Sequence, residues 1–423
     1  MNVVIGKSTA NGTVTAPPSK SYAHRLLIGA ALSRGTSTIE NVCLSDDIRA
    51  TLDCAQTLGA AVSFAETPFP QTVRVCGSGG KLLRGGEFFC RESGSTLRFF
   101  LPLALCALSE TPRANAASSG KAIFRCSPRL AERGIGVYEE ALKNAASFEK
   151  ITENGNGAIT VSGTLLPGKY TIRGNVSSQF ATGLLFALPL LPENSELEIL
   201  PPAESESYIA VTADVLKKFG VCIEKTAQNT WFIGGNQHFS SGIFRTEGDE
   251  SNAAFLKALN ALGGNVIVTG LNKNSLQGDK ICDTLFKQLS DGYTEADLKN
   301  CPDLAPVLFA VAAAKHGARF SGTRRLKIKE SNRAEAMREE LAKFGAAVTV
   351  AENEVTVLPP PCGLHAPESV LSSHDDHRIA MALTVAGMSA EGCTEITGAE
   401  CASVTFPNFY PKMQSCGVKI ELD

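Results

Sequence analysis

Short polar clusters recur along this chain, and each one leads directly into an apolar stretch that predicts a buried helix. The clusters are Ser19–Arg25, Glu92–Arg98, Ser177–Gln179, Gly248–Asn252, Pro302–Asp303 and His374–Arg378. Ser, Thr, Asp and Asn before an apolar run are typical helix N-caps. Because successive clusters start roughly 55 to 85 residues apart, the pattern indicates a repeat architecture.

A second pattern marks the helix ends, where Gly precedes a β-branched run. It occurs at Leu58–Val62, Phe219–Ile223, Phe344–Val348 and Cys416–Ile420, and more weakly at Ala145–Phe148 and Leu289–Gly292. Gly commonly ends a helix, and β-branched residues favour a strand. Six such units predict an α/β (α+β) protein with two lobes of three units each. We place the lobes at 20–242 and at 1–19 together with 243–423; the first strand, Asn2–Ile5, could belong to either.

Composition restricts the classes of protein that fit. The chain has 423 residues, which exceeds one ordinary domain, and its formal net charge of −3 argues against nucleic-acid binding. Its longest apolar run, near Phe99–Leu108, is shorter than the ~18 residues of a membrane span, and Met1–Lys7 does not resemble a signal peptide. The 13 cysteines include no C-x-x-C pair. This favours reduced thiols in the cytoplasm and no zinc site.

The polar helix starts carry the candidate chemistry. A helix N-terminus presents free N–H groups and attracts anions, so several such starts brought together would form an anion-binding cleft. Lys20, Arg25 and Arg98 lie in or beside first turns, where they could face a bound anion. Taken one at a time, each cluster is about equally consistent with a capped helix and solvated charges.

Two further segments are ambiguous on their own. Arg325–Arg333 packs four positive charges around Glu330, and Lys329 and Arg333 are predicted to share one helix face because they are four residues apart. A solvated basic patch is an equally good interpretation. His374–Arg378 could supply metal ligands, but adjacent residues point in different directions. Helix capping by Asp, with Arg378 offered to a carboxylate or phosphate, is favoured instead.

Together, the motifs resemble the 5-enolpyruvylshikimate-3-phosphate synthase family over essentially the whole chain and in the same order. The motifs that match are Ser19–Arg25, Ser93–Arg98, Ser177–Phe180, Lys329–Arg333 and Asp376–Arg378. The resemblance implies two lobes of three βαβαββ units, with helix starts facing a cleft between them. It also implies transfer of the enolpyruvyl group of phosphoenolpyruvate to the 5-hydroxyl of shikimate 3-phosphate, a step toward chorismate and the aromatic amino acids.

The resemblance also implies roles for individual residues. For shikimate 3-phosphate these are Lys20, Ser21, Arg25, Ser177, Ser178, Gln179, Ser205, Tyr208, Asp303 and Lys329. For phosphoenolpyruvate they are Lys20, Gly94, Arg98, Arg133, Gln179, Arg333 and Arg378. Asp303, Glu330 and Lys20 are the acid–base candidates, and their individual steps stay open. No metal or organic cofactor is implied, the partners are the two small substrates alone, and we expect a monomer.

The chain departs from the family pattern at several positions. Glu92 replaces an amide residue, Phe99 replaces a frequent Pro, and Gly134 is expected to place Arg133 on a looser loop. Val404 stands where many members have a phosphoenolpyruvate-binding Lys. These changes put the family's sensitivity to the inhibitor glyphosate in doubt.

Two alternatives remain from the sequence. The sister enzyme that acts on UDP-N-acetylglucosamine uses a loop cysteine before an Arg, and Cys126 lies seven residues before Arg133. The serine motifs at Ser19 and Ser177 favour the shikimate enzyme. A non-catalytic protein that binds shikimate 3-phosphate is the other alternative, and its only support is Val404.

Overall fold

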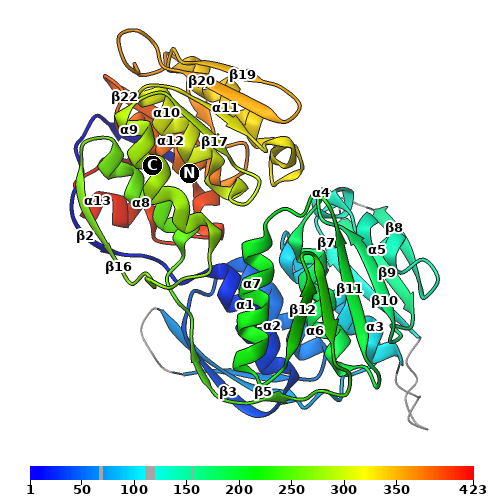
Figure 1. Ribbon diagram of the computed structural model, residues 1–423. Coiled ribbons are helices and arrows are strands. Elements are labelled where there is room, and N and C mark those ends of the chain that lie inside the picture. The colour runs from blue at the N-terminus through cyan, green and yellow to red at the C-terminus, as the bar shows by residue number, and fades with distance from the viewer. Residues whose placement is uncertain (66–69, 110–119, 154–155) are drawn as a thin grey trace. The chain divides into compact units, whose positions relative to one another are not determined.

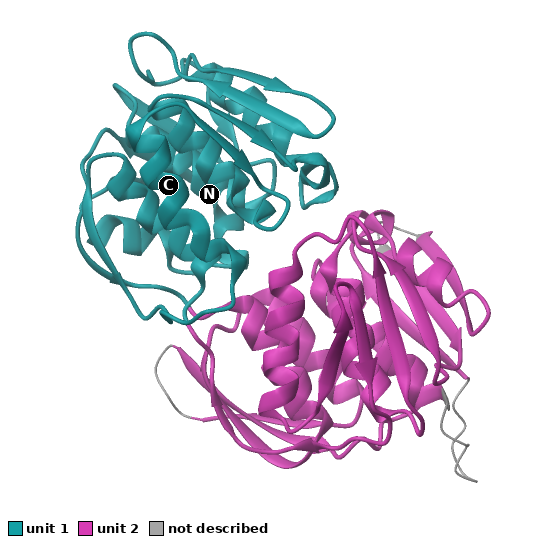
Figure 2. Ribbon diagram, in the orientation of Figure 1, with its two compact units in different colours: residues 1–17, 248–423 teal, residues 18–247 magenta. Residues whose placement is uncertain are grey.

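The computed structural model describes residues 1–65, 70–109, 120–153 and 156–423 (Figure 1). Contacts divide the chain into two compact units, one of Pro18–Glu247 and one of Met1–Pro17 with Gly248–Asp423 (Figure 2). Each unit has its own hydrophobic core. Helices and sheets alternate in both units, so the predicted α/β class is confirmed.

Unit Pro18–Glu247 contains three sheets among its described residues. The first has the order β14 (Phe239–Ser240), β3 (Ser33–Val42), β5 (Gln71–Ser78), β4 (Ala61–Phe64), and β15 (Ile243–Arg245) also pairs with β3. The second is β6 (Gly86–Arg91), β7 (Lys121–Cys126), β9 (Asn156–Gly163), β8 (Ala146–Glu153). The third is β10 (Lys169–Arg173), β11 (Ser195–Leu200), β13 (Thr230–Ile233), β12 (Ile223–Ala227).

The helices of this unit pack on one another and on these sheets. They are α1 (Lys20–Leu32), α2 (Asp46–Thr57), α3 (Gly94–Ser109), α4 (Pro128–Arg133), α5 (Gly136–Ala141), α6 (Ser178–Ala187), the 3-10 turn η1 (Leu188–Leu190) and α7 (Glu206–Lys218). Nearly every residue of α1 and α6 is buried. A helix that is apolar on all sides belongs in a core rather than on a surface. The bodies of α1 and α6 therefore lie in the core of the unit, whereas Lys20, Ser21 and Gln179 in their first turns are partly exposed.

The other unit also has three sheets in the part of the chain that the structure describes. They are β17 (Thr294–Asp297), β18 (Ala318–Ser321), β20 (Glu354–Leu358), β19 (Ala347–Val350); then β21 (Leu371–Ser372), β22 (Cys393–Thr397), β1 (Asn2–Gly6), β23 (Lys419–Leu422); and the pair β16 (Asn265–Thr269) with β2 (Asn11–Thr15). Strand β1 lies between β22 and β23 and is antiparallel to both. The N-terminal strand therefore completes a C-terminal sheet.

The helices of this unit surround a very apolar centre. They are α8 (Glu250–Ala261), η2 (Gly278–Ile281), α9 (Cys282–Asp291), η3 (Pro302–Leu304), α10 (Ala305–Ala314), η4 (Arg324–Ile328), α11 (Arg333–Lys343), α12 (His377–Gly387), η5 (Ala399–Val404) and α13 (Phe409–Ser415). Helices α8, α10 and α12 contact one another, and all residues of α12 are buried. Figure 1 shows α8, α10 and α12 close together within this unit.

Five of the six sheets share one pairing pattern, with a parallel pair followed by two antiparallel pairs. Three of these sheets, made of β6–β9, β10–β13 and β17–β20, are each built from one continuous segment of the chain in the order β-α-β-α-β-β. The pair β16–β2 is parallel and stands alone. A repeated local topology of this kind explains why the polar clusters recur along the chain.

The predicted helix boundaries are confirmed at both ends. Each of the six polar clusters runs into a helix, and Ser19, Ser177, Asp249 and Asp376 accept a hydrogen bond from a first-turn N–H group. At the other end, Gly59, Gly220, Gly345 and Gly417 all have positive φ angles, which glycine adopts without steric cost.

Within the described residues, every helix is too short or too polar to cross a membrane.

Candidate functional site

Four residues of unit Pro18–Glu247 converge where α3 begins. A Cβ atom placed on Gly94 would lie 3.3 Å from Nη1 of Arg98, 3.6 Å from Nη2 of Arg133 and 3.6 Å from Oε1 of Gln179. Glycine at this position lets the two guanidinium groups approach the backbone of a helix N-terminus. Two cations beside free N–H groups form an anion-binding arrangement. The structure thus brings together four of the residues that the family resemblance assigns to phosphoenolpyruvate.

Neighbouring side chains hold Arg98 and Gln179 in place. Arg98 donates to Oε1 of Gln179 and, at 3.4 Å, to the Gly134 carbonyl, while Gln179 Nε2 donates to Ser95 Oγ at 2.9 Å. The Arg98 guanidinium also stacks on the Phe180 ring, 5.0 Å from its centre. Both side chains are therefore oriented before any ligand arrives.

Arg133 does not lie on a loosened loop, so that prediction is wrong. It is the last residue of α4, and Gly134 ends this helix with a φ of 67°. Because glycine accepts this backbone conformation, the helix can stop directly after Arg133. The helix end fixes Arg133 beside Gly94.

Arg25 is a buried cation whose hydrogen-bond acceptors are all uncharged. The side chain is 2% exposed and donates to Thr212 Oγ1 at 2.8 Å, Thr182 Oγ1 at 3.2 Å, and the carbonyls of Ser21 at 2.9 Å and Tyr208 at 3.2 Å. Burial lowers the pKa of Arg25 to about 10, and Tyr208 and Tyr22 oppose that shift. At neutral pH the group is charged, so its acceptors leave a net positive charge that an anion would neutralise.

The other predicted residues of this unit lie at first turns. Lys20 is the first residue of α1 and its Nζ donates to Asp47 Oδ2 at 2.7 Å. Ser177 caps α6, Ser178 is the first residue of that helix, and Ser205 precedes α7 in the left-handed conformation with a φ of 58°. The Tyr208 ring lies 6.0 Å from the Arg25 guanidinium. The sequence does not indicate Asp47 as the partner of Lys20, although Asp47 also lies at a helix start.

In the other unit, Arg333 is the centre of a buried ion network. Its guanidinium is 1% exposed and donates to Asp303 Oδ1 at 2.8 Å, to Glu330 Oε2 at 2.6 Å and to Asp376 Oδ2 at 2.8 Å. One guanidinium thus connects three carboxylates, two of which are the predicted acid–base candidates in this unit.

Asp303 is surrounded by positive charge. Its Oδ1 accepts from Lys329 Nζ at 3.1 Å and from Arg333, and its Oδ2 lies 3.5 Å from Nη2 of Arg378. Burial alone would raise the pKa of Asp303, but Arg378, Lys329 and Arg333 together hold it well below its usual value. The carboxylate is ionised in the ligand-free protein.

Lys329 and Arg333 do converge, but the predicted shared helix face is wrong. Lys329 follows the 3-10 turn η4, and α11 begins only at Arg333. The two side chains meet because both bind Asp303. Burial lowers the pKa of Lys329, and Asp303 opposes that shift.

Asp376 has a second role that sequence reasoning missed. As predicted, it caps α12, accepting from the Arg378 N–H at 2.9 Å. It also accepts from Arg333 and from the N–H and hydroxyl of Ser331, at 3.2 Å and 3.0 Å. Nothing in the sequence indicates this link, because the residues are more than forty positions apart.

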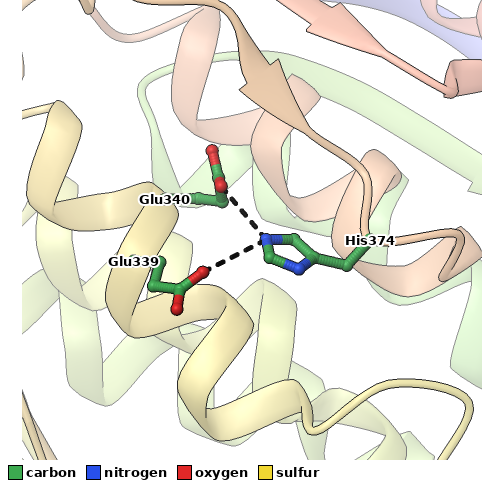
Figure 3. Close-up of side chains that lie close together, drawn as sticks. All are labelled: Glu339, Glu340 and His374. Carbon is green, nitrogen blue, oxygen red and sulfur yellow. Dashed lines mark hydrogen bonds and ion pairs between the residues drawn. The ribbon is translucent and has the colours of Figure 1, made fainter.

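Among the described residues, one group of three side chains could supply ligands to a metal ion, and it includes His374. His374, Glu339 and Glu340 each offer an atom, all within 4.8 Å of one another (Figure 3). However, Lys343 Nζ donates to both Glu340 oxygens at 3.0 and 2.8 Å, and the Ser372 N–H donates to Oε2 at 3.2 Å. Because Lys343 already neutralises the Glu340 carboxylate, we interpret the cluster as a structural contact between the His374 loop and α11 and not as a metal site.

The fourth polar cluster has a structural role here. Asp249 caps α8, and Asn252 bonds to Thr405, whose N-terminal neighbour is Val404.

Cys126 lies in β7 with its pKa raised to about 11, first by burial and then by Glu92. A protonated, buried thiol is unlike the activated thiolate of a reactive cysteine. This weighs against the UDP-N-acetylglucosamine alternative.

Fold and side chains define an α/β protein of repeated units in which Lys20, Arg98, Arg333 and Arg378 lie in or beside the first turns of helices. The model of the family EPSP synthase (3-phosphoshikimate 1-carboxyvinyltransferase) matches residues 4–413. A 3-phosphoshikimate 1-carboxyvinyltransferase of Clostridium kluyveri is 38% identical, with 99% of this chain and 98% of that protein covered. One of Clostridium novyi is 35% identical, with 98% and 97% covered.

Solved structures agree on the fold. EPSP synthase of Acinetobacter baumannii has a TM-score of 0.77 and 20% identity, with 99% of each chain covered. The chain belongs to the EPSP synthase (3-phosphoshikimate 1-carboxyvinyltransferase) family.

Proposed function

We propose that this chain transfers the enolpyruvyl group of phosphoenolpyruvate to the 5-hydroxyl of shikimate 3-phosphate and releases phosphate. The observation that carries the proposal is the Asp303 carboxylate, which is ionised and in contact with Lys329, Arg333 and Arg378. These cations suit polyanionic substrates, and the carboxylate supplies a base. Membership of the family supports the same reaction.

Phosphoenolpyruvate is assigned to the guanidinium groups around Gly94 and to Arg333 and Arg378. The convergence of Arg98, Arg133 and Gln179 on Gly94 supports the first part of this assignment. A carboxylate and a phosphate on one small molecule each suit a forked Arg donor. Lys20, at the α1 N-terminus, is assigned to both substrates.

Shikimate 3-phosphate is assigned to Arg25 and to polar residues at helix starts of the same unit, which are Lys20, Ser21, Ser177, Ser178, Gln179, Ser205 and Tyr208. The family resemblance also assigns Asp303 and Lys329 of the other unit to this substrate. Hydroxyl and amide side chains at helix starts suit a phosphate and a polyol ring. The uncompensated charge of Arg25 supports a dianionic ligand nearby.

For the chemistry, Asp303 is proposed to take the proton of the 5-hydroxyl. In the ligand-free protein its pKa is too low for an efficient base. Substrate anions would share the charges of Lys329, Arg333 and Arg378, which would raise the pKa of Asp303. Glu330 and Lys20 are the candidates for delivering a proton to the enol carbon.

A steady-state assay tests the reaction. Phosphate release from phosphoenolpyruvate should require shikimate 3-phosphate and should not occur with UDP-N-acetylglucosamine. Binding of shikimate 3-phosphate without turnover would favour the non-catalytic alternative, and activity with the UDP-sugar would favour the sister enzyme.

The protein is further proposed to act as a monomer in the cytoplasm. All 13 cysteines are free, which suits a reducing compartment. Light scattering during gel filtration would test the monomer, since a mass of twice 44.7 kDa would contradict it.

A further inference from the structure

A chain of four buried polar side chains connects α1, α2 and the start of α3. His24 Nδ1 lies 2.7 Å from Thr51 Oγ1, Thr51 Oγ1 lies 2.8 Å from Thr96 Oγ1, and Thr96 Oγ1 lies 2.7 Å from Ser93 Oγ. None of the four residues is more than 1% exposed. Buried polar groups of this kind specify one arrangement when their hydrogen bonds are satisfied.

The Thr96–Ser93 pair sets the direction of the hydrogen bonds along this chain. Thr96 Oγ1 donates to Ser93 Oγ, so its single proton is used and it must accept from Thr51. Thr51 then has no proton left for His24 and must accept from an Nδ1–H group. In each pair the residue nearer to His24 is therefore the donor: His24 donates to Thr51, Thr51 to Thr96 and Thr96 to Ser93. His24 is assigned the Nδ1–H tautomer, with Nε2 unprotonated.

The surroundings of His24 agree with this assignment. Burial lowers the pKa of His24 to about 3; Asp47 opposes the shift, while Lys20 and Arg25 add to it. The Nε2 atom is buried and has no hydrogen-bond partner in the described residues. A second N–H there would lack an acceptor, which costs free energy, so the ring stays neutral.

We propose that His24 and Thr51 are positioning residues that hold the start of α3, with Gly94 and Arg98, in the geometry that binds phosphoenolpyruvate. The proposal rests on the assignment of Gly94 and Arg98 to that substrate. Ser93 accepts from the Thr96 N–H at 3.2 Å, which caps α3 directly before Gly94. The chain of hydrogen bonds reaches this cap from two other helices, so the cap cannot turn independently of them.

The chain of hydrogen bonds also passes beside Asp47, the residue that binds Lys20. Thr96 Oγ1 approaches the Asp47 carbonyl at 3.5 Å, and the Asp47 carboxylate binds Lys20 at 2.7 Å. Thr51 lies one turn after Asp47 on α2. The Thr51 hydroxyl is the central link, and valine can replace it with nearly the same shape.

The kinetic test compares Thr51→Val with Thr51→Ser. We expect Thr51→Val, which removes the hydrogen bonds to both His24 and Thr96, to raise the KM for phosphoenolpyruvate about tenfold. The KM for shikimate 3-phosphate and kcat should change less than about threefold, and Thr51→Ser should restore most of the loss. His24→Asn, whose amide can donate from nearly the Nδ1 position, should retain more affinity than His24→Leu.

An unchanged KM for phosphoenolpyruvate in folded Thr51→Val would overturn the proposal, and so would an equal rise for both substrates. Nitrogen-15 NMR of the wild-type protein tests the tautomer independently of any variant. At pH 7 the His24 ring should show a protonated Nδ1 and a bare Nε2. An Nε2–H signal would overturn the direction of the chain.

Arg98→Lys separates this proposal from the site assignment on which it rests. If that variant leaves the KM for phosphoenolpyruvate unchanged, the assignment of Arg98 fails and the positioning role falls with it. If Arg98→Lys raises the KM but Thr51→Val does not, only the positioning role fails.

Discussion

Arg333 binds Asp376 through both carboxylate oxygens, with 2.8 Å from Nε to Oδ2 and 3.2 Å from Nη2 to Oδ1. Asp376 is fully buried and Arg333 is 1% exposed. The same Arg333 binds Asp303, so the α12 cap also positions the carboxylate proposed as the base.

Asp376→Ala should be strongly destabilising. Removing one partner of a buried ion pair typically costs about 3–5 kcal/mol because the other charge is left uncompensated. Denaturant unfolding followed by circular dichroism measures the change. The matched control is Glu335→Ala, which breaks the exposed pair with Arg338 and should cost less than about 1 kcal/mol. Equal costs for the two variants would contradict the buried network.

Replacement by methionine should affect stability much less at Arg25 than at Arg333. Arg25→Met removes a buried charge that has only uncharged acceptors, so the free energy of unfolding should change by no more than about 1–2 kcal/mol. Arg333→Met leaves carboxylates unpaired and should cost about 3–5 kcal/mol. Calorimetric titration with shikimate 3-phosphate should nevertheless show at least about a hundredfold weaker binding for Arg25→Met. Retained affinity would refute the role of Arg25.

Asp279 gives the stability of its unit a pH dependence. It is 2% exposed, and burial, followed by the charge of Asp303, raises its pKa to about 6. Because the folded pKa lies above the unfolded value, the favourable contribution is complete below about pH 4 and is lost as the pH rises through 6. Asp279→Asn should therefore stabilise the protein relative to wild type by roughly 2–3 kcal/mol more at pH 7.5 than at pH 4. Unfolding measured at both pH values is the test, and a difference of zero or of opposite sign would refute it.

Tyr138 should support the guanidinium groups around Gly94 indirectly. Its hydroxyl lies 2.7 Å from the Arg98 carbonyl and 2.9 Å from the Phe180 carbonyl, and so connects α3 with α6. Tyr138→Phe should cost about 1 kcal/mol of stability and raise the KM for phosphoenolpyruvate severalfold. The control Tyr410→Phe, which removes a bond to the Ala399 carbonyl in the other unit, should cost similar stability with a smaller change in KM. If the two variants lose similar stability and show the same rise in the KM for phosphoenolpyruvate, Tyr138 has no specific effect on the site.

The local elements could be predicted from the sequence because they depend on neighbouring residues. The Ser19 cap and the helix-ending Gly220 are examples, since both act within a few positions. The partners of Arg25 could not be predicted. Thr182 and Thr212 lie on α6 and α7, and only the packing of three helices brings their hydroxyls to one guanidinium.

The helix-face prediction for Lys329 failed for a related reason. A spacing of four residues indicates a shared face only where the chain is helical, and α11 does not start until Arg333. Both residues still reach Asp303, which is far away in the sequence. The charged residues of Arg325–Arg333 mark this segment in the sequence, but the positions of their side chains depend on the fold.

The place of β1 determines when each unit can fold during synthesis. Unit Pro18–Glu247 is continuous and can form as soon as its last residue has left the ribosome. Strand β1 is synthesised before unit Pro18–Glu247, but its partners β22 and β23 are synthesised after that unit, and Asp423 bonds back to Asn2 at 3.1 Å. Strand β1 therefore stays unpaired until β22 has been made, so a nascent chain stalled after residue 390 should hold one folded unit and one incomplete one.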